Sequence, residues 1–218
     1  MSFRVVCISR TIAAGGESIG YTIAERLGFR YVDEQIIERA AQQAQVDPKL
    51  VEASEHKKPL MQRLLDRLAD AADLAGPLAL ATGLPVDAFT PASTGYHATS
   101  DDLRVLIRAA IHEVAAAGNA VIVAHAASMA LGAAPGVLRV MVTASPEIRA
   151  QRLATARGLS AAAAADAIAA SDRERREYFQ SFYHLKEELP THYDVIINTD
   201  VITPAVATDL ILAAQGAP

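Results

Sequence analysis

Residues whose types and spacing could bind a ligand cluster in one short loop near the N-terminus, residues 9–18. The apolar run 5–8 precedes this loop, and a helical pattern with Ile19, Ile23 and Leu27 on one face follows it. In a strand–loop–helix turn, successive backbone N–H groups and the positive end of the helix point into one small space, which favours an anion such as phosphate. The sequence therefore predicts a phosphate site in this loop.

The loop matches the P-loop pattern GxxxxGK[ST] only in part. If Gly15 is the second glycine, the first falls on Arg10, the lysine on Gly16 and the hydroxyl on Glu17, or on Ser18 with the variant spacing. The lysines of the chain lie elsewhere, at Lys49, Lys57, Lys58 and Lys186. Any cation acting on a bound phosphate is then an arginine, and Arg10 can grip two phosphate oxygens at once. The alternative is an ordinary turn whose glycines supply tight backbone geometry.

Length and composition favour one α/β domain with a full hydrophobic core, since the chain has 218 residues of which 51% are hydrophobic. The net charge of −5 supplies no basic field, so nucleic acid is not an expected partner, whereas a small anionic ligand is. The six histidines show no metal-ligand spacing, and no structural metal is predicted.

The chain is expected to be cytoplasmic. Its N-terminus leads straight into a strand pattern without a signal-peptide arrangement, and the lone Cys7 indicates a small buried hydrophobe in a reducing compartment. The uncharged stretch 74–86 is too short and too broken by proline and glycine to cross a membrane, so no membrane association is expected.

Strand patterns near Val5, Arg30, Ala120, Val137 and Val195 alternate with helical patterns. This alternation predicts a parallel sheet with right-handed crossovers and helices on both faces. The pairs Ser145-Pro146 and Thr203-Pro204 predict the starts of two of the helices.

Asp33 and His125 each follow one of the expected strands, at the edge where open α/β sheets bind ligands. Asp33 can equally cap a helix that starts at Glu34. Three arginines at positions 173, 175 and 176 form the densest charge cluster of the chain. They are typical of a solvated helix face, or alternatively of a set aimed at phosphates.

Residues 46–100 differ in character from the rest of the chain. They combine a charged break, an apolar helical stripe and a proline-interrupted apolar stretch, with residues 60–92 as the most apolar part. We interpret this region as an insertion that covers the ligand site or forms a subunit interface. The interface explains its apolar excess better, so a homodimer is expected.

Several motifs follow one another in a fixed order along nearly the whole chain apart from this insertion. They are Ile8-Ser9-Arg10, Gly15-Gly16, Ile19-Gly20, residues 27–33, residues 118–123, Gly158-Leu159-Ser160, and residues 171–175 with Tyr178. As a set they resemble the cytidylate kinase-like family of P-loop proteins. The resemblance implies the nucleoside monophosphate kinase type of the P-loop NTPase fold, with a five-stranded parallel sheet, helices on both faces, a helical insertion and an arginine-bearing lid. The family's loop, roughly SRxxGSGGxxIG, also lacks the P-loop lysine.

The resemblance implies a single domain over residues 1–218, an acceptor or dimer region at about 46–100, and a lid at about 150–185. It implies that ATP, with Mg²⁺, is held by the loop residues Ser9, Arg10, Ala13, Ala14, Gly15, Gly16, Glu17 and Ser18. It implies that the transferring phosphoryl group is stabilised by Arg10, Arg152, Arg173 and Arg175. Asp33 and His125 take the positions near the acceptor nucleotide.

Two departures from the family pattern bear on activity. Ala13 and Ala14 replace loop residues that are usually glycine or serine, and Ala124-His125-Ala126 replaces a GRG whose arginine grips the acceptor phosphate in true cytidylate kinases. The sequence is therefore compatible with two functions. One is phosphoryl transfer from ATP to CMP, dCMP or another small acceptor; the other is a degenerate kinase that senses a nucleotide or acts as a scaffold without turnover.

Overall fold

The structure is a computed structural model that describes residues 3–33, 100–124 and 126–216 of the 218-residue chain. Nearly all of the expected insertion at 46–100, including residues 60–92, lies outside the described residues, as does His125.

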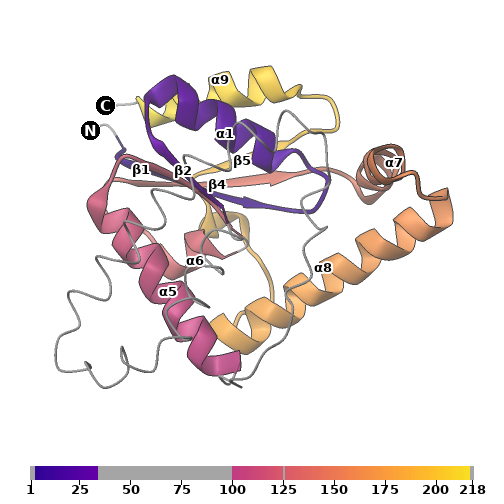
Figure 1. The fold of residues 1–218 in the computed structure, drawn as a ribbon, viewed down its shortest axis with the longest axis horizontal. Helices are drawn as coiled ribbons and strands as arrows, with labels where there is room; N and C mark the ends of the chain where they lie inside the picture. The colour runs from indigo at the N-terminus through magenta and orange to yellow at the C-terminus, as the bar shows by residue number, and fades with distance from the viewer. Residues whose placement is uncertain (1–2, 34–99, 125, 217–218) are drawn as a thin grey trace, which may run out of the picture.

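A five-stranded parallel sheet forms the centre of the molecule, with the strand order β2-β3-β1-β4-β5 (Figure 1). Its strands are β1 (Val5–Arg10), β2 (Arg30–Asp33), β3 (Ala120–Val123), β4 (Val137–Thr143) and β5 (Val195–Asn198). The described helices are α1 (Gly16–Leu27), α5 (Ser100–Ala117), α6 (Ala127–Leu131), α7 (Pro146–Arg157), α8 (Ala161–Tyr183) and α9 (Pro204–Gln215), with a short 3-10 turn η1 (Pro190–His192). The predicted sheet is confirmed, and each of the five expected strands forms.

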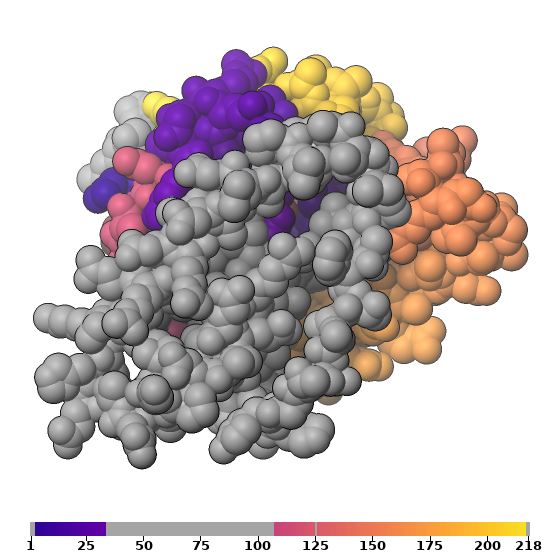
Figure 2. All heavy atoms as spheres, in the orientation of Figure 1, coloured from indigo at the N-terminus to yellow at the C-terminus, as the bar shows by residue number. Residues whose placement is uncertain are grey.

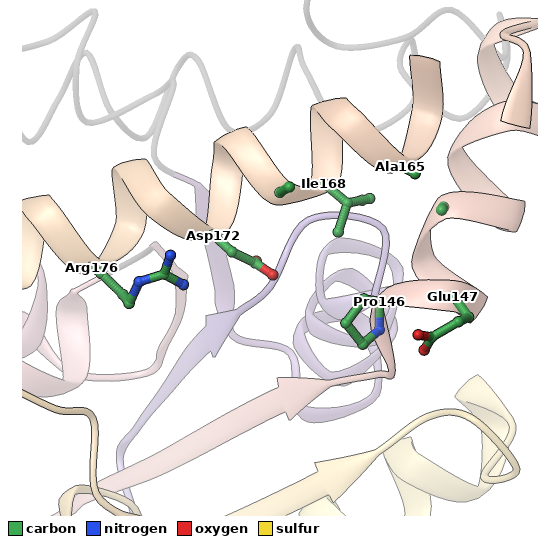
Figure 3. Close-up of a pocket in the computed structure, with 8 residues that line it drawn as sticks. Pro146, Glu147, Ala165, Ile168, Asp172 and Arg176 are labelled. Atoms are coloured by element: carbon green, nitrogen blue, oxygen red, sulfur yellow. The ribbon is translucent and has the colours of Figure 1, made fainter. Parts of the chain in front are cut away.

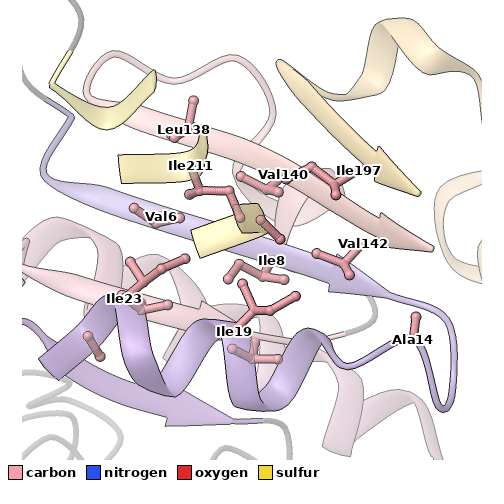
Figure 4. Close-up of a cluster of buried hydrophobic side chains, with 14 of the residues drawn as sticks. Val6, Ile8, Ala14, Ile19, Ile23, Leu138, Val140, Val142, Ile197 and Ile211 are labelled. Atoms are coloured by element: carbon pink, nitrogen blue, oxygen red, sulfur yellow. The ribbon is translucent and has the colours of Figure 1, made fainter. Parts of the chain in front are cut away.

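Helices α1 and α9 cover one face of the sheet, and α5 and α6 cover the other (Figure 1). Alternate residues of β1 supply the two cores, because successive side chains of a strand point to opposite faces. Val6 and Ile8 pack against Ile19, Ile23 and other apolar residues on the α1–α9 side (Figure 4).

The other face of β1 carries Val5 and Cys7, which pack with Ala110 and Val114 of α5. Cys7 is fully buried, and this burial raises the pKa of its thiol to about 12. The thiol is therefore neutral at ordinary pH, as the small buried hydrophobe predicted from the sequence should be.

Side-chain caps start the helices that the sequence placed by Ser-Pro and Thr-Pro pairs. The hydroxyl of Ser145 accepts from the N–H of Ile148, and that of Thr203 accepts from the N–H of Val206. These caps confirm the expected starts of α7 and α9.

Helices α7 and α8 pack against each other beside the carboxyl ends of the strands, and they correspond to the expected lid region (Figure 1). In the space-filling view their atoms, drawn in orange, project at one side of the molecule (Figure 2). A small apolar cluster of Leu153, Ala164 and Ile168 joins the two helices, and Ile12 and Ala13 of the N-terminal loop pack on it. The loop therefore contacts both the sheet and the helix pair.

Candidate functional site

The N-terminal loop connects the central strand β1 to α1 through two left-handed residues. Ala13 has φ 59° and Gly15 has φ 86°, and the N–H of Ala14 donates to the carbonyl of Thr11 over 3.2 Å. A left-handed alanine is strained, whereas glycine adopts this conformation freely. The two alanine methyl groups have packing partners, since Ala14 is buried among the residues of the α1–α9 core (Figure 4) and Ala13 packs on the α7–α8 cluster.

Position 16 must be a glycine because its backbone lies against the side chain of Arg10. A Cβ built on Gly16 would lie 2.7 Å from the Cβ of Arg10, closer than real side chains approach. The loop therefore folds back over the base of the Arg10 side chain, which brings the first turn of α1 against the end of β1.

The first amides of α1 are suited to an anion. Intrahelical bonding begins at Ile19, whose N–H donates to the carbonyl of Gly15 over 3.2 Å. Among the backbone hydrogen bonds of the described residues, none is donated by the N–H of Gly16, Glu17 or Ser18 to a carbonyl. Unpaired amides at a helix start, together with the helix dipole, form the usual cradle for phosphate.

The electrostatics of this cradle are mixed, because Arg10 forms an ion pair and hydrogen bond with Glu17 in the first turn of α1. The negative charge of Glu17 therefore offsets much of the positive charge that Arg10 would offer to a phosphate. Ser18 directs its hydroxyl back to the carbonyl of Gly15 over 3.0 Å.

Asp33 ends β2 at the same edge of the sheet as the loop. Tyr31, two residues earlier, has a raised pKa, chiefly because it is buried and then because the charges of Asp33 and Glu17 oppose its ionisation, while Arg10 favours it. The four residues Arg10, Glu17, Tyr31 and Asp33 thus share one electrostatic neighbourhood. The helix that Asp33 could cap lies outside the described residues, as does His125, so their acceptor roles stay predictions.

Arg152 of α7 reaches the loop from outside. Its guanidinium donates to the hydroxyl of Thr199 over 3.0 Å, to the carbonyl of Thr199 over 2.6 Å, and more weakly to the carbonyl of Ala13 over 3.4 Å. The buried Thr199 hydroxyl in turn donates to the carbonyl of Ala14 over 2.9 Å. Arg152 and Thr199 together hold the outer side of the loop.

Arg175 of α8 is 7% exposed and reaches the loop from the opposite end. It donates to the Arg10 carbonyl over 3.0 Å and forms a two-pronged ion pair with Glu188. Arg173 and Arg176 of the same cluster are exposed. The solvated-face interpretation therefore fits Arg173 and Arg176 but not Arg175, and no described contact tests a phosphate role for Arg173.

Sequence reasoning missed Thr199, which holds the loop, and Glu188, which pairs with Arg175. It also missed Tyr193, whose hydroxyl donates to Glu188, and Ser128, whose hydroxyl accepts from that of Ser9 over 3.4 Å. Thr199 follows a strand and in that respect resembles Asp33 and His125, which is a usable signal. The other three belong to no motif in the sequence, and their links to the loop run through Arg175 of α8 and Ser9 of β1, which only the tertiary fold brings near them.

A central parallel strand, a glycine-bearing loop and a helix start with unpaired amides, in the strand order 2-3-1-4-5, define a P-loop kinase fold of the nucleoside monophosphate kinase type. A sequence model of the Cytidylate kinase-like family matches residues 5–201. The chain belongs to this family, and the resemblance stated from its motifs is confirmed.

Solved structures with low sequence identity share the fold. An uncharacterized protein from Eubacterium ventriosum superposes with a TM-score of 0.66 at 14% identity, over 98% of this chain and 99% of the other. Shikimate kinase from Bacteroides thetaiotaomicron superposes with a TM-score of 0.50 at 16% identity, over 99% of this chain and 100% of the other. No curated protein matches in sequence. No described helix has the length and apolar character needed to cross a bilayer.

Proposed function

We propose that residues 9–18 hold the phosphates of ATP and that the protein transfers a phosphoryl group from ATP to a small acceptor, with CMP or dCMP as the first candidates. The observation that carries this proposal is the start of α1, where three successive amides lack a carbonyl acceptor among the described residues. Gly16 lets this start lie close to the side chain of Arg10. Family membership supports the choice of a nucleotide.

Within this proposal, the amides of Gly16, Glu17 and Ser18 bind phosphate oxygens. Arg10 is the cation nearest to them along the chain, and Asp33 lies at the sheet edge where the acceptor nucleotide would bind. Ser18 carries the one hydroxyl in the first turn of α1 that could reach Mg²⁺ bound to the nucleotide. The metal would supply charge neutralisation between the phosphates. Arg173 is exposed on α8, and its assignment to the phosphoryl group rests on the family resemblance alone.

A second function, a nucleotide-binding protein without turnover, is favoured by the Arg10–Glu17 ion pair. A carboxylate inside the phosphate cradle weakens anion binding and places a negative charge next to the transferring group. The strained backbone of Ala13 in the loop also favours this second function. Such a protein would bind a nucleotide as a sensor or a scaffold.

An acceptor screen distinguishes the two functions. ADP formation from MgATP is measured with each nucleoside monophosphate in turn, and the kinase proposal predicts turnover that depends on CMP or dCMP. Equal ADP production with every acceptor would contradict the acceptor assignment. Absence of ADP with all acceptors, in a protein that binds ATP, would support the second function.

We further propose that the chain is a single domain, since the family model spans residues 5–201, and that it is cytoplasmic, since its lone cysteine indicates a reducing compartment. The apolar excess of residues 46–100 in the sequence favours a homodimer. Sedimentation velocity should give a species of twice the monomer mass. A monomer at concentrations of tens of micromolar would contradict the dimer.

A further inference from the structure

A buried polar network lies beneath the N-terminal loop, and its centre is Arg175. The Nε and Nη2 atoms of Arg175 donate to the two carboxylate oxygens of Glu188 over 2.9 and 2.6 Å. Its Nη1 atom donates to the carbonyl of Arg10 over 3.0 Å, and its Cζ lies 4.7 Å from the centre of the Phe179 ring. The guanidinium therefore contacts the loop backbone and Glu188 at the same time.

Tyr193 completes the network. Its hydroxyl donates to Glu188, and Ser9 of β1 also forms a hydrogen bond with Tyr193. Tyr193 is buried, and its pKa is raised first by this burial and then by the carboxylate of Glu188. The neutral hydroxyl thus persists at physiological pH and keeps its hydrogen to donate.

These contacts link three separate segments: the end of β1 at Ser9 and Arg10, helix α8 at Arg175, and the residues before β5 at Glu188 and Tyr193. The carbonyl that Arg175 holds belongs to the peptide between Arg10 and Thr11, where the loop begins. On its other side this peptide is held by the N–H of Thr11, which donates to the carbonyl of Val142 over 3.1 Å. The first peptide plane of the loop is fixed from both sides.

We propose that Arg175, oriented by Glu188 and Tyr193, is a positioning residue that fixes the start of the phosphate loop. Its part in the reaction is to hold the Arg10–Thr11 peptide, and through it the amides of α1, in the geometry that receives phosphate. A buried guanidinium whose three nitrogens all donate hydrogen bonds is suited to this task, because moving it to a ligand would leave Glu188 uncompensated. The effect on nucleotide affinity rests on the function proposed above, whereas the effect on the loop does not.

A second ion pair, which joins α8 to α7, provides a matched control. Arg149 of α7 is 3% exposed and forms a two-pronged pair with Asp172 of α8, over 2.8 and 2.6 Å. It also donates to the carbonyl of Ala144 over 3.0 Å. None of the hydrogen bonds described for this pair reaches the loop. Asp172 instead borders a hollow of about 340 Å³ between α7 and α8, which Pro146 and Ile168 also line (Figure 3).

The test compares Glu188→Gln, Tyr193→Phe and Asp172→Asn by hydrogen–deuterium exchange of the full chain without nucleotide. The reporters are the amides of Thr11 and Ala14, which are protected by Val142 and by Thr11. We expect these amides to exchange about tenfold faster in Glu188→Gln and several-fold faster in Tyr193→Phe, with no change in Asp172→Asn. Tyr193→Phe removes a single hydroxyl, so it tests the positioning role of Arg175 even if Glu188→Gln does not fold.

Titration with MgATP on the same variants adds a readout that loss of stability alone would not move. At a similar loss in melting temperature, Glu188→Gln should weaken ATP binding by about tenfold and Asp172→Asn should leave it unchanged. Unchanged loop exchange in Glu188→Gln and Tyr193→Phe, or equal acceleration in Asp172→Asn, would overturn the positioning role. If the exchange pattern holds but the wild-type protein does not bind ATP, the positioning role stands and the proposed function fails.

Discussion

At the scale of single residues, the most telling feature is the short distance between the first turn of α1 and Arg10. Gly16→Ala would place a methyl group 2.7 Å from the Cβ of Arg10, so the loop or the strand end has to shift. We expect a loss of about 1–3 kcal/mol in the free energy of unfolding, as for other overpacked sites. Chemical denaturation measures this loss.

Gly216→Ala is the control for this change. A Cβ at Gly216 would lie 3.7 Å from the carbonyl of Leu212, an ordinary contact, so its stability should stay close to that of the wild-type protein. Equal stability of the two variants would contradict the close approach of Gly16 to Arg10.

Glu17 determines how much positive charge Arg10 offers to a ligand. Glu17→Gln removes the carboxylate charge from the first turn of α1 while keeping the shape of the side chain. Because one charge near a solvated site contributes on the order of 1 kcal/mol, ATP affinity should rise roughly five-fold in calorimetric titration.

Glu147→Gln makes the same change of net charge in the first turn of α7, where the carboxylate is exposed. It should leave ATP affinity as it is. A Glu17→Gln protein that binds ATP no better than Glu147→Gln would show that the cradle does not receive the phosphates.

At the scale of secondary-structure elements, the carboxylate of Asp194 holds the start of the edge strand β5 to β4, in addition to the backbone pairing of the two strands. Asp194 accepts from the backbone N–H of Arg139 over 2.9 Å and from its guanidinium over 3.1 and 2.7 Å. These hydrogen bonds, chiefly those of the Arg139 side chain, hold the pKa of Asp194 below its usual value. The carboxylate therefore stabilises the fold when it is ionised.

The pH dependence follows from the direction of this shift. A lowered pKa in the folded state means that the stabilisation is present above the ordinary value of 3.8 and is lost as the pH falls through the folded-state pKa. Asp194→Asn should be less stable than the wild-type protein at pH 6, and the difference should shrink below about pH 4 in denaturation curves. A difference that stays constant between pH 6 and pH 3 would contradict this account.

The elements themselves could be predicted from the sequence because their signals are local. Apolar runs at Val5 and Ala120 predicted two of the strands, and Ser145-Pro146 predicted the start of α7. The contacts of Arg175 could not be predicted. Its partners Arg10 and Glu188 are brought to it by tertiary packing, and nothing in the charge cluster distinguishes it from the exposed Arg173.

At the scale of the whole molecule, the strand order places the loop at the centre of the carboxyl edge of the sheet. Strand β1 lies between β3 and β4, so the start of α1 lies at the middle of the edge where open α/β sheets bind ligands. Arginines of the α7–α8 pair hold the loop from two sides, Arg152 at Ala13 and Arg175 at Arg10. The region expected to act as a lid is thus attached to the loop in this conformation.

Under the proposed function, backbone amides of the loop take the part of the P-loop lysine that this chain lacks. The loop that carries these amides is held by the buried Arg175 and the half-buried Arg152. The charge available to the phosphates is then set by the balance between Arg10 and Glu17.

Calorimetric titration of the wild-type chain and of Gly16→Ala with ATP, in the presence of Mg²⁺, tests the central claim most directly. We predict binding with a Kd on the order of 10 μM for the wild-type protein and a loss of at least about tenfold in Gly16→Ala, because the methyl group displaces the cradle. No binding up to millimolar ATP, or equal binding by both proteins, would contradict a phosphate site in the loop of residues 9–18.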